Sequence, residues 1–475
     1  MEDDYEKIQI TAMILLLKLK QEIKESSKWF KVVLAISALI YIFLWFFTIH
    51  LSFIQKTKGL EPVLPSAPKD SQEYVVLSES LMHGQGLSQA GRLETLRLFG
   101  YPLFVGIIKT FGRSYFLVTL VQIMLVFVTA LIVRLIGILF SSKSVGEIAA
   151  TLLLLNPVTM TLALLILTDV LFLFLFVLGF YLIVSIDQEK TIWKTCLSAL
   201  VFVCAIFVRG MGIFALPIFL TPFLATKVPF RTQLQLMLVT VIFIVLSITP
   251  WVIRNYVETG VVAFNSFESV NMSWSIPKFL SVLNNTNEED ETLAFQKATG
   301  VPQSAWQDLS WHDIRYSKQI NAVGEKIILE HPISYLKFHI TTSIPFLFPS
   351  SILFMRDAYD SATGTVRPFK YGAINYLTSG NWKAFYENIK EVWWKLAERI
   401  LWLLALLVAI YSVYINRRKS LTWVFVFIIL YLMALAGPAA GPRISFQAWP
   451  LMFILFASGG VSLFQKFSRS YSKIA

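Results

Sequence analysis

The chain has 475 residues, of which 56% are hydrophobic and only 15% are charged, and its mean hydropathy is +0.64. Soluble domains carry about 25% charged residues, so this composition excludes a water-soluble fold. The net charge of +11 comes from short Lys and Arg clusters between apolar runs, as in the cytoplasmic loops of membrane proteins, and we predict no nucleic-acid partner. The sequence therefore predicts an all-α polytopic membrane protein.

The predicted topology begins with a charged segment, residues 1–31, that we expect to stay in the cytoplasm. Its lysines lie before the apolar run Val32–Phe53, and cationic segments remain on the cytoplasmic side during insertion. Because no cleavable signal pattern is visible, we expect this run to remain as an anchor. Residues 54–114 then form a first outer loop, and Tyr115–Phe140 returns the chain to the cytoplasm.

Two later apolar stretches are too long for one helix each. The stretch Ile148–Ile186 has about 39 residues, whereas one span needs about 20. We predict two helices here, joined by an outer turn that contains Asp169. The stretch Thr195–Thr226 is likewise predicted as two helices, with the break at Arg209 on the outer side. Lysines that follow each pair give this orientation.

The remaining chain is predicted to hold the largest outer region and the last spans. A seventh span, Leu234–Val252, completes an N-terminal transmembrane module at 32–252, and residues 253–395 follow as an outer-face region. We interpret 335–355 within this region as re-entrant or interfacial, because a full crossing there would place a later basic cluster outside. Residues 396–475 supply the last spans and a cytoplasmic tail. The total is about ten transmembrane helices.

Charged residues from distant parts of the chain meet at the outer face in this topology. Charges at membrane depth are costly, so they mark functional sites or anchor helices at the interface. Asp169 is the strongest candidate, because an acidic group inside an apolar stretch needs a cation, a hydroxyl or water as a partner. The charged residues gathered by the predicted topology are Asp70, Glu73, Asp169, Arg209, Arg254 and Arg443.

The three arginines of this set indicate a phosphate ligand. A guanidinium binds phosphate through paired hydrogen bonds and stays charged in a low-dielectric setting, which suits a lipid phosphate or diphosphate. Contact with ordinary phospholipid head groups is the alternative. A carboxylate beside such a site can act as general base towards an acceptor hydroxyl. Together these groups predict transfer from a phosphate-linked lipid.

Loose motifs occur in order from about residue 70 to residue 450. The first outer loop holds Asp70-Ser-Gln-Glu-Tyr74, His83-Gly-Gln-Gly-Leu-Ser88 and Glu94-Thr-Leu-Arg-Leu-Phe-Gly-Tyr-Pro-Leu-Phe104. Asn156-Pro157, Leu167-Thr-Asp-Val-Leu-Phe172, Val208-Arg-Gly210, Pro250-Trp-Val-Ile-Arg-Asn-Tyr256, His331-Pro332 and Pro442-Arg443 follow. In order and spacing the chain resembles bacterial GT-C glycosyltransferases, the relatives of the protein O-mannosyltransferases and of the aminoarabinose transferase of lipid A.

The resemblance implies a GT-C-like bundle and a set of site residues. The family has its catalytic aspartate early in the first outer loop, where Asp70 matches, with Glu73 as the runner-up. Asp169 matches an acidic position that contributes to the active-site cavity. The chain departs from the family at Pro102, because relatives have a double proline there. The residues assigned to the lipid phosphate are Arg97, Arg209, Arg254 and Arg443.

On this interpretation the chain is an inverting glycosyltransferase that uses a polyprenyl-phosphate sugar. Asp70 would accept the proton of a glycan, lipid or protein acceptor while the arginines stabilise the departing phosphate. No metal is required, although Asp70, Glu73 and Asp169 could hold a divalent cation. The expected location is the bacterial inner membrane, among membrane lipids, with the site on the periplasmic or extracellular face.

Two other classes share part of this pattern. An O-antigen polymerase or ligase would use outward arginines on lipid diphosphate, but it needs no early outer-loop aspartate. A lipid-linked sugar flippase or transporter would line a path with charges and often shows repeat symmetry. The tryptophans of the outer region, Trp274, Trp306 and Trp311, either stack on an acceptor sugar or pack inside a small capping domain.

Overall fold

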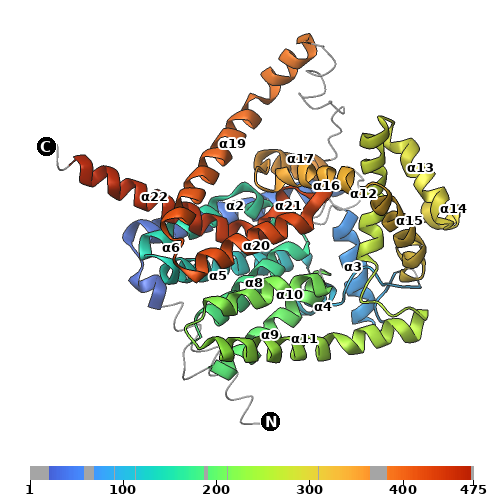
Figure 1. The fold of residues 1–475 in the computed structure, drawn as a ribbon, viewed down its shortest axis with the longest axis horizontal. Coiled ribbons are helices and arrows are strands. Elements are labelled where there is room, and N and C mark those ends of the chain that lie inside the picture. The colour runs from blue at the N-terminus through green and yellow to red at the C-terminus, as the bar shows by residue number, and fades with distance from the viewer. Residues whose placement is uncertain are drawn as a thin grey trace.

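The computed structural model describes residues 21–57, 69–89, 91–112, 114–186, 191–210, 212–308, 310–363 and 382–471. Within these ranges the chain is almost entirely helical, and the strands are a short antiparallel pair, β1 (Ser88–Gln89) and β2 (Arg92–Leu93). The long helix α19 (Trp382–Ile415) and the end of α22 (Trp449–Tyr471) project from the helix bundle (Figure 1). The protein is an all-α integral membrane protein, as its composition predicts.

Helices follow one another with short connections throughout the described residues. The first are α2 (Lys28–Thr57), α3 (Lys69–Met82), α4 (Gly100–Gly112), α5 (Tyr115–Phe140), α6 (Lys143–Leu155), α7 (Pro157–Ala163), α8 (Thr168–Val184) and α9 (Thr191–Val208). Later come α11 (Phe230–Thr259), α12 (Phe267–Asn284), α13 (Glu288–Thr299), α14 (Gln303–Gln307), α15 (Ser317–Glu330), α16 (Pro332–Ser343), α17 (Ser351–Thr363), α20 (Ser420–Ala436) and α21 (Pro442–Ser445). Single 3-10 turns are η3 (Ser310–His312), η4 (Ile314–Tyr316), η5 (Ile344–Phe346), η6 (Gly437–Ala439) and η7 (Phe446–Ala448).

The candidate membrane spans are somewhat fewer than the ten or so that the sequence predicts. Among the described residues, 7 helices are long and apolar enough to cross a membrane, or up to 9 if each of two bent pairs is one span. One bent pair is α6 with α7, at 59°, and two shorter apolar segments are Thr168–Val184 and Leu216–Ala225. The seven long helices match seven of the predicted spans, α6 with α7 and the shorter helix α8 lie where two more were expected, and the segment 212–225 is too irregular to count as the tenth.

Both predicted helix breaks are present, but the segments beyond them differ. Helix α7 ends before Asp169, which lies in the first turn of α8, and α9 ends just before Arg209. The second predicted helix of the 195–226 stretch was wrong. It consists of η1 (Gly212–Ala215), α10 (Leu216–Leu220) and η2 (Thr221–Ala225), because prolines without N–H groups start new short turns.

The seventh span is longer than predicted. Helix α11 continues to Thr259 through Pro250 and ends at Gly260, whose φ of 74° fits a left-handed C-cap. Arg254 therefore lies inside this helix and not in the loop after it, which corrects the predicted boundary at Val252. Pro250 has no backbone N–H, so the helix lacks the hydrogen bond that this residue would donate, but it continues past the proline.

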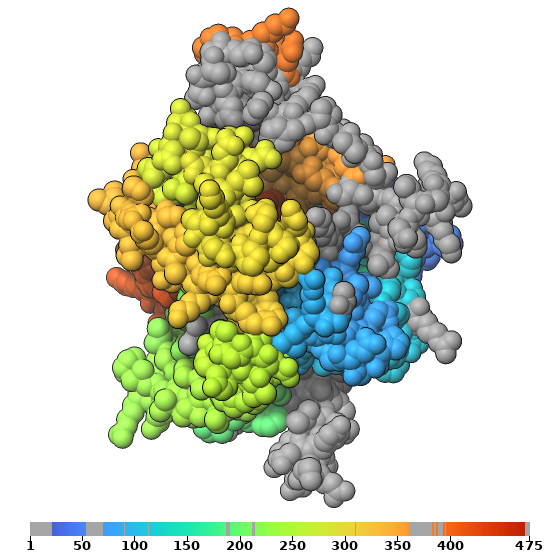
Figure 2. All heavy atoms as spheres, turned by 90° about the vertical axis from the view of Figure 1, so that its right-hand side faces the viewer, coloured from blue at the N-terminus to red at the C-terminus, as the bar shows by residue number. Residues whose placement is uncertain are grey.

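The outer region contains a small unit with its own apolar core. The cap unit, which we define as α12–α15, packs around Ile276, Phe295, Trp306 and Ile320. The Trp306 and Trp311 rings lie 4.7 Å apart inside it, so packing and not an exposed sugar platform describes these two residues. Figure 2 shows the yellow cap unit directly against the blue segment that holds α3. The unit therefore covers one side of the first outer loop.

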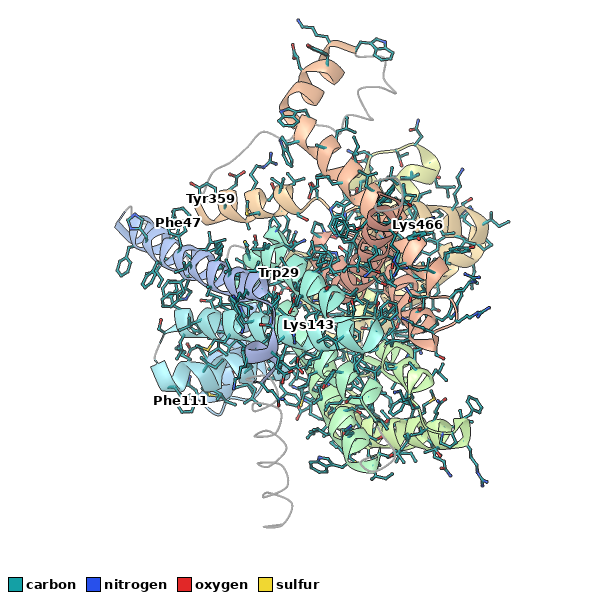
Figure 3. All side chains as sticks on the ribbon, turned by 90° about the vertical axis from the view of Figure 1, so that its left-hand side faces the viewer. Trp29, Phe47, Phe111, Lys143, Tyr359 and Lys466 are labelled. Carbon is teal, nitrogen blue, oxygen red and sulfur yellow. The ribbon has the colours of Figure 1, made fainter. Side chains whose placement is uncertain are left out.

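The segment predicted as re-entrant is a bent helix pair. The portions Pro332–Phe346 and Ser351–Asp360 meet at 82°, which is the form of a broken span or a re-entrant loop. The second portion lies beside the first span, where the rings of Phe47 and Tyr359 stack with centroids 6.5 Å apart (Figure 3). The bend fits a broken span as well as a re-entrant loop, so the interpretation of 335–355 stays a prediction.

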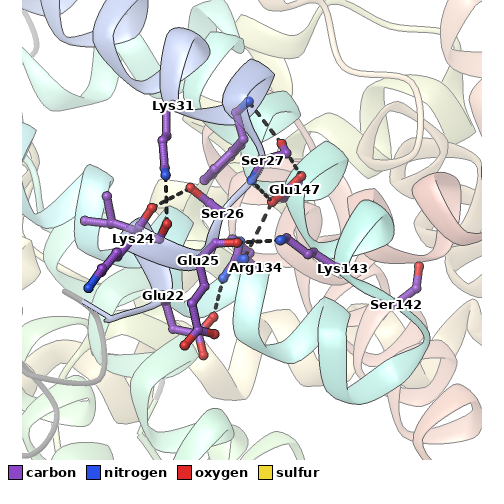
Figure 4. Close-up of polar contacts among 12 residues, drawn as sticks. Glu22, Lys24, Glu25, Ser26, Ser27, Lys31, Arg134, Ser142, Lys143 and Glu147 are labelled. Atoms are coloured by element: carbon purple, nitrogen blue, oxygen red, sulfur yellow. Dashed lines mark hydrogen bonds and ion pairs between the residues drawn. The ribbon is translucent and has the colours of Figure 1, made fainter.

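A buried ion-pair cluster joins the N-terminal segment to helices α5 and α6. Arg134 is 1% exposed and pairs with Glu22 and, at 3.5 Å, with Glu147. The Glu147 carboxylate also accepts hydrogen bonds from the backbone N–H and the hydroxyl of Ser27, at 2.9 and 2.6 Å (Figure 4). The helices approach closely here, since a Cβ on Gly146 would lie 2.2 Å from the Arg134 carbonyl oxygen. We call Glu22, Ser27, Arg134 and Glu147 the Arg134 cluster.

Candidate active site

The two outer-loop acids stand at the start of helix α3. Asp70 and Glu73 are three residues apart, so they lie on one face of the helix, one turn from each other. Asp70 belongs to the first turn, where the helix dipole favours a negative charge. The two carboxylates can therefore contact the same side chains.

Arg97 joins these two acids. Its guanidinium donates to Asp70 Oδ1 at 2.7 Å and to Glu73 Oε2 at 3.0 Å, and lies 5.3 Å from the centre of the Tyr74 ring. The loop before α4 is held in shape by Glu94, whose carboxylate accepts the backbone N–H of Arg97 at 2.9 Å. The loop thus positions the Arg97 guanidinium against the two acids of α3.

Arg443 connects the outer loop to the middle of the chain. It follows Pro442 at the start of α21 and donates from Nη1 to Asp70 Oδ2 at 2.7 Å. Its Nε donates to Asp169 Oδ2 at 2.8 Å, and Arg209 donates to the other oxygen of the same carboxylate. Asp169 is completely buried, so two guanidiniums compensate its charge.

These ion pairs connect the charged residues described above into one cluster. Five segments bring together three carboxylates and three guanidiniums, so their formal charges cancel. The charge cluster consists of Asp70, Glu73, Arg97, Asp169, Arg209 and Arg443. The sequence predicted all six as site residues, and the structure places them in contact.

Burial and charge act in opposite directions on Asp70. Burial on its own raises the pKa of this carboxyl, but the positive charges of Arg97 and Arg443 outweigh it and leave the pKa below its ordinary value. Asp70 is 27% exposed at its side chain, so it lies at the open edge of the cluster. With both oxygens on arginines, it is an ionised but weakened base in this state.

Arg254 is not part of the charge cluster. Its guanidinium donates to the Glu94 carbonyl oxygen at 3.2 Å and to Asn255 at 2.8 Å, and it lies 4.6 Å from the centre of the Trp251 ring. These contacts hold the backbone of the outer loop just before Arg97. The structure therefore places Arg254 behind the loop that carries a cluster arginine.

Several polar residues around the cluster were not predicted. Gln122 is fully buried; it donates to the Leu165 carbonyl at 2.7 Å and accepts from the Tyr101 hydroxyl at 2.8 Å. It thus adds a second hydrogen bond to a carbonyl in the break before Asp169, which also accepts the backbone N–H of Leu167 at 2.9 Å. A lone amide in the apolar run 115–140 is the signal that could have identified it. With its amide oxygen turned towards the site, Gln447 accepts from Arg209 at 3.1 to 3.2 Å.

The cap unit is fastened to the same outer loop. Arg92 pairs with Asp308 at 3.0 Å, and the Thr95 hydroxyl accepts the N–H of Ile314 at the same distance. Burial, followed by the charge of Arg97, lowers the pKa of His312 to about 4. This imidazole is therefore neutral at pH 7 and lies within the electrostatic reach of the cluster. Sequence reasoning gave no signal for it.

An apolar cavity lies between helices of the bundle, and none of the charge-cluster residues lines it. It has a volume of about 710 Å³ and is lined by α6, α19, α20 and α22, with Trp402 and Phe453 among its walls. At one end Glu398 accepts the N–H of Ser351 at 2.5 Å. Its wall includes Pro157 of α7, and α7 packs on α21, the helix that carries Arg443. Cavity and cluster are thus joined through neighbouring helices.

The acids considered for a divalent cation are occupied by arginines. No group of three or more His, Cys, Asp or Glu side chains arranged for a metal ion occurs within the described ranges. Each cluster acid instead meets at least one guanidinium at hydrogen-bond distance. The donor set here is suited to an anion that competes for guanidinium groups.

The chain has a fold similar to that of a solved membrane-embedded oligosaccharyltransferase. The Archaeoglobus fulgidus oligosaccharyltransferase tethered to an acceptor peptide with the NVT sequon aligns with a TM-score of 0.50 and 15% identity, covering 93% of this chain and 50% of that chain. The chain thus spans about half the length of that enzyme, and at this identity the likeness concerns the fold alone.

Two further solved structures align less well. The oligosaccharyltransferase AglB of the same organism, in complex with an inhibitory peptide and a dolichol-phosphate, gives a TM-score of 0.47 at 14% identity over 94% of this chain and 52% of that chain. ArnT from Cupriavidus metallidurans in the apo state gives 0.38 at 12% identity over 91% and 76%. No family model and no curated protein matches the sequence.

Proposed function

We propose that the chain is an inverting glycosyltransferase that moves a sugar from a polyprenyl-phosphate donor to an acceptor hydroxyl. The observation that carries this proposal is the charge cluster, in which Arg97 and Arg443 hold Asp70 between them at the open edge. A partly exposed pair of guanidiniums around a carboxylate is a suitable arrangement for a phosphate and a base at one reacting centre.

The apolar cavity supports a donor with a long lipid chain. Its volume of about 710 Å³ lies within the range of about 300–1,000 Å³ for ligand sites, and its walls are mostly aliphatic and aromatic. Arg443 stands at the start of the candidate span Pro442–Ser470 and Lys466 near its end, which supports opposite membrane faces for the two. The positive-inside rule then assigns the charge cluster to the outer face, which in a bacterial inner membrane is the periplasmic one.

The transfer step assigns each group a role. The acceptor oxygen forms a bond to the anomeric carbon, while the bond from that carbon to the phosphate oxygen breaks and its electron pair stays on the phosphate. The hydroxyl proton passes to the Asp70 carboxylate. The lipid phosphate gains one negative charge, so the contacts of Arg97 and Arg443 strengthen towards the transition state and lower its energy.

The test is single-turnover transfer by the purified chain in nanodiscs. A radiolabelled polyprenyl-phosphate sugar is the donor, and cell-envelope glycans and lipids are the acceptors. We expect label to move with inversion at the anomeric carbon, and Arg443→Ala to reduce transfer. Transfer from a lipid-diphosphate glycan, with none from the monophosphate sugar, would replace this proposal by a polymerase or ligase. Movement of the intact lipid across the bilayer without transfer would favour a flippase.

A further inference from the structure

We infer that the donor phosphate and Asp70 compete for the same guanidiniums, so that donor binding displaces Asp70 from Arg443 and Arg97 and frees it to act as the base. This inference rests on the proposed function. In the state described by the structure, Asp70 occupies the positions that a phosphate would take. The enzyme would then keep its base restrained until a donor is bound.

The first argument is the occupancy of the guanidiniums. Arg443 uses Nη1 on Asp70 and Nε on Asp169, and Arg97 uses Nη2 on Asp70 and Nε on Glu73. Arg209 is likewise engaged by Asp169. Every arginine of the cluster therefore already has a carboxylate partner. A phosphate that is to bridge Nη2 of Arg97 and Nη1 of Arg443 must replace Asp70, which bridges these two groups in this state.

The second argument identifies the carboxylate that leaves. Asp169 has no exposed surface and is held by two arginines, so its release would leave an uncompensated charge in the interior. The Asp70 side chain is 27% exposed, so the carboxylate can leave the arginines towards solvent without a large desolvation cost. It is also the cluster acid that bridges Arg97 to Arg443, so one departure opens both guanidiniums together. Glu73 contacts Arg97 alone within the cluster.

The exchange has a chemical consequence for the reaction. With both oxygens on guanidiniums, Asp70 is poorly placed to accept a proton from a hydroxyl or from water. Once the phosphate holds the arginines, the carboxylate loses two positive neighbours and becomes more basic. Because the charges of the resting cluster cancel, the bound donor adds negative charge beside Asp70, which raises its basicity further. Activation of the base would thus follow donor binding.

The test compares the affinity of three proteins for polyprenyl phosphate, titrated by calorimetry into nanodiscs that hold the full chain. Removal of the competing charge in Asp70→Asn should tighten binding about tenfold or more, because a charge-assisted contact no longer has to be broken. The matched control Glu73→Gln removes a carboxylate from the same helix face and should change affinity by less than about threefold.

The possible outcomes separate this inference from the proposed function. Unchanged or weaker binding by Asp70→Asn overturns the exchange, and so does an equal gain in Glu73→Gln. Absence of binding by all three proteins overturns the proposed function as well. If Asp70→Asn fails to fold, carbodiimide labelling of wild-type Asp70, read by mass spectrometry, replaces it. Labelling should rise severalfold with polyprenyl phosphate, and an unchanged or reduced rate contradicts the exchange.

Discussion

The chain contains two buried ion-pair clusters, and they differ in how completely they are closed. In the Arg134 cluster, Arg134 and Glu147 are 1% and 2% exposed, and the remaining capacity of the carboxylate is used by Ser27. In the charge cluster the side chains of Asp70 and Arg443 are 27% and 26% exposed. Both clusters pair acids with arginines, but the pair of Asp70 with Arg443 is the more accessible to a ligand. Glu22, at 19%, is the most exposed partner in the ion pairs of the Arg134 cluster, whereas in the charge cluster both partners of one ion pair are about a quarter exposed.

The largest difference between the clusters should appear in catalysis. Asp70→Asn keeps the shape of the side chain and removes the base, so single-turnover transfer should fall by about 10²- to 10⁴-fold. Glu73→Gln should cost less and Asp169→Asn an intermediate amount, because these residues position others. Near-normal turnover of Asp70→Asn with loss in Glu73→Gln would move the role of base three residues along the helix.

The Arg134 cluster should respond in stability and not in donor binding. Arg134→Met leaves Glu147 buried without its partner, which should cost about 3–5 kcal/mol of unfolding free energy. Denaturation in detergent, followed by circular dichroism, measures this. The double variant Arg134→Met with Glu147→Gln should recover much of the loss, since no unpaired charge remains. A folded Arg134→Met protein with wild-type stability would contradict the structural role.

Removal of a guanidinium from the open edge should weaken the donor. Arg443→Ala should reduce affinity for polyprenyl phosphate by about 1.5–3 kcal/mol, which is roughly 10- to 150-fold. Equilibrium binding to nanodisc-embedded protein measures the change. Arg443→Lys is the matched control: it keeps the charge without the forked geometry and should lie between wild type and Arg443→Ala. Equal affinity in all three would leave Arg443 as an anchor of α21.

The smallest effect on donor affinity is expected for Arg254, which lies outside the charge cluster. The sequence assigns this residue to the lipid phosphate, but its contacts are with the Glu94 carbonyl and with Asn255. Arg254→Ala should therefore change donor affinity by less than about threefold and stability by about 1 kcal/mol. The same binding assay measures it. A loss as large as that of Arg443→Ala would return Arg254 to the phosphate site.

Sequence reasoning found the breaks that build the site because charge interrupts an otherwise apolar run. Asp169 and Arg209 were visible for this reason, and both lie at helix ends. The pairing of Arg97 with two acids was not visible, because no pattern tells which charges meet. The short turns after Gly212 were missed because the composition of the stretch is that of a span, whereas two prolines decide its local geometry.

Charged side chains inside helices were harder to interpret than those at breaks. Arg134 lies within the apolar run Tyr115–Phe140 and was not singled out from the sequence as a site residue, yet it is among the largest fully buried side chains. Its partner Glu147 lies one turn inside the next helix. The proximity of the two follows from the close approach of α5 to α6 at Gly146, which is a property of the packed structure.

The cap unit has a core of its own, separate from that of the helix bundle. Substitutions around Ile276, Phe295 or Ile320 therefore act on the cap's own packing and leave the bundle interior unchanged. Over evolutionary time this lets the outer surface of the cap diverge under its own selection, while the residues that hold the charge cluster stay fixed. The surface of the cap can in this way change without repacking the bundle that positions Asp169 and Arg443.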